Sequence, residues 1–133
     1  MGIPPAVVAE FGARLRSLGW VTELFVGGSA ATGDYTPGVS DIDLVALVAD
    51  PVDAARQATL VAVHLDLDEG AAAGLDLGCV YVEEALLHDD GALHPTWTHG
   101  ALVQRILSGV ARAELVRDGY AVFGRSPRNV LPP

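Results

Sequence analysis

One short stretch of the sequence is suited to holding a phosphate group. An apolar run ends in Gly27-Gly28-Ser29. Glycines let backbone N–H groups approach a ligand, and a serine at the start of a helix leaves free amides that favour an anion. The stretch therefore predicts a phosphate-binding turn formed by Gly28 and Ser29.

A second stretch, Ser40-Asp41-Ile42-Asp43-Leu44, is suited to holding a metal ion. Alternate side chains of a β-strand point to the same face, so the two carboxylates would lie side by side and require a cation. Mg²⁺ is usually held by one or two carboxylates together with water and phosphate oxygens. Asp41 and Asp43 are therefore predicted Mg²⁺ ligands, and Ser40 is included with Gly28 and Ser29 as a nucleotide-binding candidate.

Each stretch by itself has an ordinary structural explanation. A glycine turn followed by serine is typical of a helix N-cap, and Asp-x-Asp is common at solvated turns. Both together, in this order, favour a site that binds Mg²⁺ and the polyphosphate of a nucleotide.

The combined pattern resembles the DNA polymerase β-like nucleotidyltransferase superfamily. Within it, Gly-Gly-Ser-Ala-Ala-Thr-Gly-Asp at residues 27–34 and Ser-Asp-Ile-Asp-Leu at residues 40–44 are similar to aminoglycoside nucleotidyltransferases, especially the streptomycin adenylyltransferase type, and to minimal nucleotidyltransferases. The resemblance spans roughly residues 20–125. It implies an enzyme that transfers a nucleoside monophosphate from a nucleoside triphosphate, with ATP the first candidate.

The resemblance also implies a third carboxylate on the next strand, acting as a metal ligand or as the general base toward the acceptor hydroxyl. Asp76 is the candidate for both roles, because it lies inside an otherwise apolar strand, where an acid is unfavourable to bury unless a metal or another partner compensates it. The alternative is that Asp76 lies at the exposed start of its strand.

Periodicity along the chain predicts the elements that position these residues. The expected fold class is α/β (α+β), a nucleotidyltransferase fold with a small mixed β-sheet flanked by helices. Residues 1–126 are expected to form the catalytic domain and residues 127–133 a tail or linker. The expected helices are 5–18, 52–63 and 102–116, the expected strands are 20–26, 42–48, 75–82 and 120–123, and 66–74 is expected to be a loop.

Composition narrows the range of functions. Acidic residues outnumber basic ones 17 to 8, and the net charge of −9 disfavours a nucleic-acid partner. No apolar stretch is long enough to span a membrane. The single cysteine, Cys79, lies in an apolar run that predicts a buried thiol, and Trp97 is expected in the core. A cytoplasmic protein is expected.

The expected function is Mg²⁺-dependent transfer of AMP from ATP to a hydroxyl of a small-molecule acceptor. The negative surface suits a polycationic acceptor such as an aminoglycoside. The alternative is a minimal nucleotidyltransferase antitoxin that binds a partner toxin and can adenylylate it. A third reading is a nucleotide-binding relative without transfer activity.

Two features leave the cleft incomplete at the level of sequence. The basic residues nearest the motifs are Arg16 and Arg56, so positive charge for a triphosphate is scarce. The resemblance implies a C-terminal helical domain that completes the cleft, whereas this sequence stops at Pro133. Either the sequence is part of a longer protein, or a second copy or another polypeptide completes the cleft.

Overall fold

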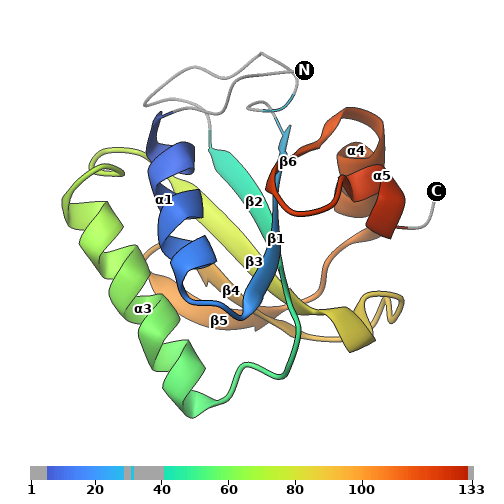
Figure 1. Ribbon diagram of the computed structural model, residues 1–133, viewed down its shortest axis with the longest axis horizontal. Helices are drawn as coiled ribbons and strands as arrows, with labels where there is room; N and C mark the ends of the chain where they lie inside the picture. Colours follow the sequence, from blue (N-terminus) through green and yellow to red (C-terminus); the bar gives the residue numbers. More distant parts are fainter. Residues whose placement is uncertain (1–5, 29–30, 32–40, 132–133) are drawn as a thin grey trace.

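The computed structural model describes residues 6–28, residue 31 and residues 41–131, which form a mixed β-sheet with helices on both faces (Figure 1). The strands are β1 Val21–Gly27, β2 Ile42–Val48, β3 Leu77–Glu83, β4 His94–Thr98, β5 Ala101–Arg105 and β6 Tyr120–Phe123. Their order in the sheet is β5-β4-β3-β2-β1-β6, with β2 and β3 parallel and the other neighbours antiparallel. The expected α/β (α+β) fold class is confirmed. The helices are α1 Ala6–Ser17, α3 Ala54–Glu69, the 3-10 helix η1 Glu84–Leu86, α4 Gly109–Asp118 and α5 Pro127–Val130.

One face of the sheet is covered by α1 and α3 (Figure 1). Apolar residues at helical spacing on both helices pack on alternate residues of the central strands, among them Leu24, Leu44 and Cys79. Cys79 is a buried free thiol, as its apolar surroundings predicted, and burial raises its pKa to about 12. This face holds the larger of the two cores.

The described residues cover the opposite face only in part. Leu115 of α4, with Leu107 and Leu131, packs on Phe25 and Val45 in a second core. Among the sheet strands, α4 makes its main contacts with β1. The face of β3, β4 and β5 therefore remains available to line a cavity.

Helix α3 is longer than the sequence predicted. It continues to Glu69 through residues expected to begin a loop, because Leu60, Val63, His64 and Leu67 keep helical spacing and are buried. The acidic residue Asp66 remains exposed within this helix and pairs with Arg14 of α1. The side chain of Asp53 caps the helix start by accepting a hydrogen bond from Arg56 N at 2.8 Å.

The expectation of a helix over residues 102–116 is wrong for its first part. Residues 101–105 form β5, which is joined to β4 by a two-residue turn at His99 and Gly100, with φ of 49° and 78°. Positive φ at both central residues is typical of a type I′ hairpin turn. The helix begins after Ser108, whose hydroxyl accepts a hydrogen bond from Ala111 N at 3.1 Å.

Residues 127–133 were expected to form a tail or linker. Within this stretch the structure places α5, which packs against α4, and buries Leu131 to 3% exposure. No helix in the described part of the chain is both long and apolar enough to cross a membrane.

Candidate nucleotide site

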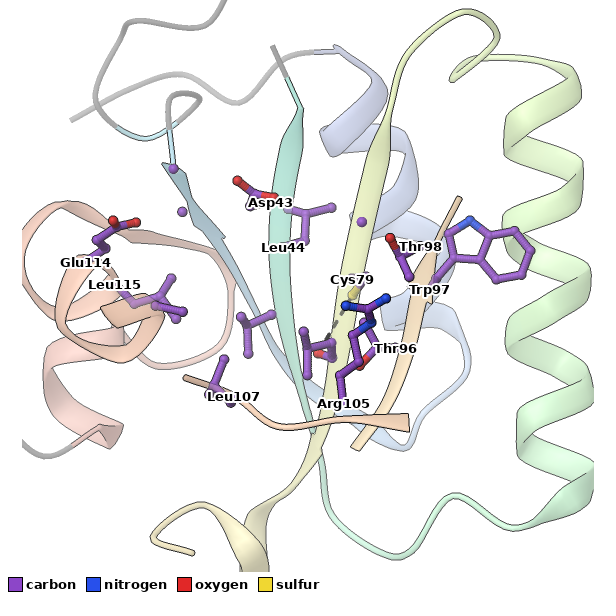
Figure 2. A pocket seen from close by; sticks show the side chains of 16 residues that line it. Asp43, Leu44, Cys79, Thr96, Trp97, Thr98, Arg105, Leu107, Glu114 and Leu115 are labelled. Atoms are coloured by element: carbon purple, nitrogen blue, oxygen red, sulfur yellow. Dashed lines mark hydrogen bonds between the residues drawn. The ribbon is translucent and has the colours of Figure 1, made fainter. Parts of the chain in front are cut away.

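A cavity of about 240 Å³ opens on the partly covered face of the sheet (Figure 2). The strands form its floor, and α4 forms one wall through Ala111, Glu114 and Leu115. In Figure 2, Asp43 and Glu114 lie on one side of this cavity and Arg105 and Thr98 on the other.

Asp43 is the predicted metal ligand that reaches the cavity directly. It lies on β2 between Gly27 of β1 and Gly78 of β3, which are its paired neighbours in the sheet. A residue on either side with a larger side chain would crowd the carboxylate, because paired residues project on the same face. The two glycines therefore leave open space around Asp43.

Gly28, a predicted nucleotide-binding residue, lies against the Asp43 carboxylate. Its φ is 60°, in the left-handed region that favours glycine, and a Cβ placed there would lie 2.6 Å from Asp43 Oδ2. Only a residue without a side chain lets this backbone pass so close to the carboxylate. The other two nucleotide-binding candidates, Ser29 and Ser40, lie outside the described residues.

Asp41 and Asp76 precede β2 and β3 in the parallel pair. Ile42 pairs with Leu77, and Ile42 N donates a hydrogen bond to Asp76 O at 2.7 Å. Asp41 and Asp76 come directly before that pair, so they are neighbours at the end of the sheet where β2 and β3 begin. Asp76 is exposed at the start of its strand, so the burial argument for its role does not hold and the alternative placement is the observed one.

The carboxylates influence one another electrostatically. Desolvation raises the pKa of Asp43, and the negative charges of Asp41, Glu114 and Asp76 raise it further. Asp43 thus has like charge near it from Asp41 in its own segment and from Glu114 and Asp76 in two other segments of the chain. A bound cation would relieve this repulsion.

Glu114 was missed in the sequence. It lies on α4 beside Leu115, on the side of the helix that faces the cavity. The sequence did contain a signal. Ala111 and Leu115 lie on one apolar helix face, and Glu114 lies three residues after Ala111 and directly before Leu115. That signal is weak, because the helix boundaries were themselves mispredicted.

The described residues contain no group of three or more His, Cys, Asp or Glu side chains already arranged to hold a metal ion. The donor chemistry nevertheless fits Mg²⁺, since the coupled groups are hard carboxylate oxygens around an open space. Two protein carboxylates suffice for Mg²⁺ when water and phosphate oxygens complete its coordination.

The positive charge in the cavity comes from Arg105 of β5, which the sequence did not indicate. Arg16 lies over the Phe123 ring and Arg56 over the Trp20 ring, at 5.8 Å and 4.8 Å from the ring centroids, so neither lines the cavity. Arg105 of β5 does line it. Trp97 also borders the cavity, but its side chain is 2% exposed and stacks on His64, which confirms its expected core position.

The chain is similar to known proteins at the level of family and fold. The chain matches the family described as nucleotidyltransferase domain over residues 8–90. Among curated protein sequences, none matches this chain.

Several solved structures share the fold, and two of them were solved with a nucleotide. The chain is similar to the spectinomycin adenyltransferase from Enterococcus faecialis, solved with ATP and spectinomycin, with a TM-score of 0.70 and 12% identity. That match covers 93% of this chain, which spans only 59% of the length of that protein. A toxin-antitoxin structure solved with AMP-PNP matches with a TM-score of 0.50 and 17% identity, over 91% of this chain and 75% of that one.

Proposed function

This chain belongs to the nucleotidyltransferase domain family, which matches more than half of its residues, and from this we propose that it transfers AMP from ATP to a hydroxyl of a small-molecule acceptor with the help of Mg²⁺. The observation that carries the proposal is Asp43, which lies between two glycines in a cavity and is surrounded by three further carboxylates. This arrangement suits a metal-bound polyphosphate better than any neutral ligand.

Asp41 and Asp43 would hold Mg²⁺, and Asp76 is the third candidate ligand. When bound, Mg²⁺ neutralises phosphate charge and orients the triphosphate. The backbone at Gly28 would approach the phosphates, with Ser29 and Ser40 as further nucleotide contacts. Gly28 supports this role because it already lies against the Asp43 carboxylate.

The transfer needs one proton acceptor. The acceptor oxygen attacks the α-phosphorus, the bond from that phosphorus to pyrophosphate breaks, and the hydroxyl proton passes to a carboxylate. Asp76 is the proposed base, because it is exposed to an incoming ligand and close enough to Asp43 to influence its pKa.

An aminoglycoside is the first acceptor to test. The net charge of −9 favours a cationic ligand, and the structurally similar adenyltransferase was solved with spectinomycin. A cavity of about 240 Å³ is below the roughly 300–1,000 Å³ typical of drug-sized ligands. A second copy of the chain, or another polypeptide, would then complete the acceptor cleft.

The second candidate function is a minimal nucleotidyltransferase antitoxin that binds a partner toxin and can adenylylate it. The similarity to a toxin-antitoxin structure solved with AMP-PNP favours it. A partner protein would supply both the acceptor hydroxyl and the missing part of the cleft. Co-purification with the product of a neighbouring reading frame would separate this function from the first.

The first experiment is a calorimetric titration of ATP, GTP, CTP and UTP into the protein, with and without Mg²⁺. The test variant is Asp41→Asn/Asp43→Asn, which keeps side-chain size and removes two charges. Asp50→Asn is the matched control, because Asp50 is exposed just beyond the opposite end of β2. We expect Mg²⁺-dependent binding, with ATP preferred, in the wild type and the control but not in the double variant.

Two results would count against the proposal. Absence of binding by all four nucleotides would indicate a partner-binding module or a half-site. Binding that is equal with and without Mg²⁺ would contradict the role of the aspartate pair. If binding is confirmed, pyrophosphate release in the presence of an aminoglycoside panel tests the acceptor.

A further inference from the structure

We propose that Arg105 determines acceptor specificity by binding an anionic group, a carboxylate or a phosphate, on the acceptor molecule. This inference rests on the proposed nucleotidyl transfer, and it names a different acceptor class from the polycationic aminoglycosides that are tested first. The acceptor it describes carries both a hydroxyl to be modified and a negative charge some distance away.

The strand register places Arg105 on the same face of the sheet as Asp43. Arg105 pairs with His94, two residues before Thr96, and Thr96 pairs with Val80 of β3. Val80 in turn pairs with Val45, two residues after Asp43 on β2. Because alternate residues share a face, all of these side chains project toward the cavity side. Figure 2 shows the Arg105 side chain extending from β5 over the cavity floor.

Arg105 has no competing partner among the described residues. It is the only basic residue among those that line the cavity, and it takes part in none of the ion pairs found in the described part of the chain. By contrast, Arg14, Arg112, Arg117 and Arg125 each pair with an acid. A guanidinium presented to a ligand cavity with its donors available is suited to bidentate binding of a carboxylate or phosphate.

The cavity is therefore charged oppositely at its two ends. Asp43 and Glu114 lie at one end and Arg105 at the other (Figure 2). The apolar residues Val45, Val80 and Leu107 also line the cavity, and Val45 and Val80 are paired on the neighbouring strands β2 and β3. A ligand that is cationic throughout would satisfy only the acidic end. A ligand with an anionic group beyond an apolar segment would satisfy both.

The order of the strands assigns the Arg105 end to the acceptor rather than to the nucleotide. The phosphate turn at Gly28 follows β1, whereas the proposed base Asp76 precedes β3, on the other side of β2. An acceptor hydroxyl near Asp76 leaves the rest of that molecule to extend over β3, β4 and β5. Four strand spacings of about 4.8 Å separate β5 from β1, roughly 19 Å in all. This distance is beyond the reach of one arginine side chain.

The test compares hydroxyl compounds with and without an anionic group. The probes are 4-(hydroxymethyl)benzoate and its amide, and 4-(hydroxymethyl)phenyl phosphate with its dephosphorylated form. Binding is measured by NMR titration, with and without Mg²⁺ and α,β-methylene-ATP, which cannot release pyrophosphate. The variants are Arg105→Gln, Arg105→Lys as a conservative rescue, and Arg117→Gln as a control, since Arg117 is an exposed arginine outside this cavity.

We expect the wild type and Arg117→Gln to bind the anionic member of each pair about tenfold more tightly or better, the gain typical of a charge-assisted hydrogen bond. Arg105→Gln should lose this preference, Arg105→Lys should keep part of it, and affinity for the nucleotide analogue should change less than twofold.

Three outcomes would overturn the inference. The wild type could bind both members of each pair equally, or bind none of the four probes. Alternatively, Arg105→Gln could weaken the nucleotide analogue by a large factor while leaving the anion preference unchanged, which would assign Arg105 to the triphosphate. Failure of the proposed function is separate, because it would appear as absence of analogue binding in the wild type, whereas the charge preference is also measured without nucleotide.

Discussion

At the scale of single residues, the surroundings of Asp43 destabilise its charged form, and the pKa of its carboxyl group is raised. Desolvation raises this pKa, and the neighbouring carboxylates Asp41, Glu114 and Asp76 add to the effect. The folded protein therefore binds the Asp43 proton more tightly than the unfolded chain does. As the pH rises through the raised pKa, the charged form destabilises the metal-free fold relative to the unfolded chain.

The substitution Asp43→Asn should stabilise the metal-free protein at pH 7. Removing one of several repelling charges is expected to raise the melting temperature by roughly 2–4 °C, corresponding to about 0.5–1 kcal/mol. Thermal melts with and without Mg²⁺ and ATP measure this, with Asp50→Asn as the control. The variant should also lose the further rise that Mg²⁺ and ATP give the wild type. A variant that melts below the wild type would show that Asp43 has a stabilising partner.

Gly28→Ala should weaken nucleotide binding for a reason that can be separated from backbone strain. Gly28 and Gly74 both have positive φ, 60° and 77°, so alanine is strained at either position. Only at Gly28 would the new Cβ collide with another group, the Asp43 carboxylate, since no atom lies within 4 Å of a Cβ at Gly74. Strain alone is expected to destabilise both variants by about 1–2 kcal/mol.

Calorimetric titration of Mg²⁺ and ATP distinguishes the two effects. Gly74→Ala should retain wild-type affinity, and Gly28→Ala should lose at least tenfold. Equal affinity in both variants would mean that the approach of Gly28 to Asp43 has no part in binding.

At the scale of elements, an ion pair between Glu23 of β1 and Arg125 joins β1 to the chain after β6. Glu23 is 4% exposed, and its carboxylate accepts hydrogen bonds from Arg125 N at 3.1 Å and from Arg125 Nε at 2.9 Å. Burial opposes the charged form of Glu23, but the hydrogen bonds from Arg125 and Thr22 lower its pKa overall. The pair therefore stabilises the fold at neutral pH, and this contribution is lost as the pH falls through the lowered pKa.

Arg125→Met should destabilise the protein by about 1–3 kcal/mol, because it leaves a buried carboxylate with fewer donors. This expected destabilisation is smaller than for a fully buried ion pair, because the Arg125 side chain is half-exposed. Urea unfolding measures the change, and Arg117→Met is the control, since Arg117 is exposed and, among the residues that the structure describes, forms an ion pair only with the adjacent Asp118. In the double variant Glu23→Gln/Arg125→Met, the loss should be smaller than the sum of the single losses. Strict additivity would refute the coupling.

At the scale of the whole molecule, His64 connects α3 to the sheet and to α1. It stacks on Trp97 with ring centroids 4.7 Å apart, contacts Phe11 at 5.0 Å, and forms a hydrogen bond between Nε2 and the Tyr81 hydroxyl at 2.6 Å. Burial lowers the pKa of His64 to about 3, so the residue is neutral in the folded protein. The unfolded chain would protonate it near the ordinary value of about 6.5.

The free energy of unfolding should therefore fall as the pH drops from about 7 toward 3. The unfolded chain binds the extra proton in this window, and the His64 contribution to the slope approaches about 1.4 kcal/mol per pH unit. Urea unfolding at a series of pH values measures the slope. The double variant His64→Phe/Tyr81→Phe keeps the rings and removes the titrating group, so its slope should be shallower. His94, whose pKa is also lowered by burial and by Arg112, would account for part of the slope that remains.

The sequence by itself determined the local parts of this protein. Alternating and helical apolar patterns located α1, β1, β2, β3 and β6, because these patterns reflect which side of an element is buried. The motif at Gly28, Asp41 and Asp43 also indicated the family, since its residues lie close together in sequence. Acidic excess and the lone cysteine were likewise properties of composition.

Only the tertiary structure decided what depends on contacts between distant segments. The apolar spacing of residues 102–107 fits a helix or a strand, and pairing with β4 through the His99-Gly100 turn selected β5. The same pairing brings Arg105 into the cavity, as helix packing on β1 brings Glu114. Neither residue is near the motif in sequence, so no local pattern could predict that a guanidinium and a fourth carboxylate would share a cavity with Asp43.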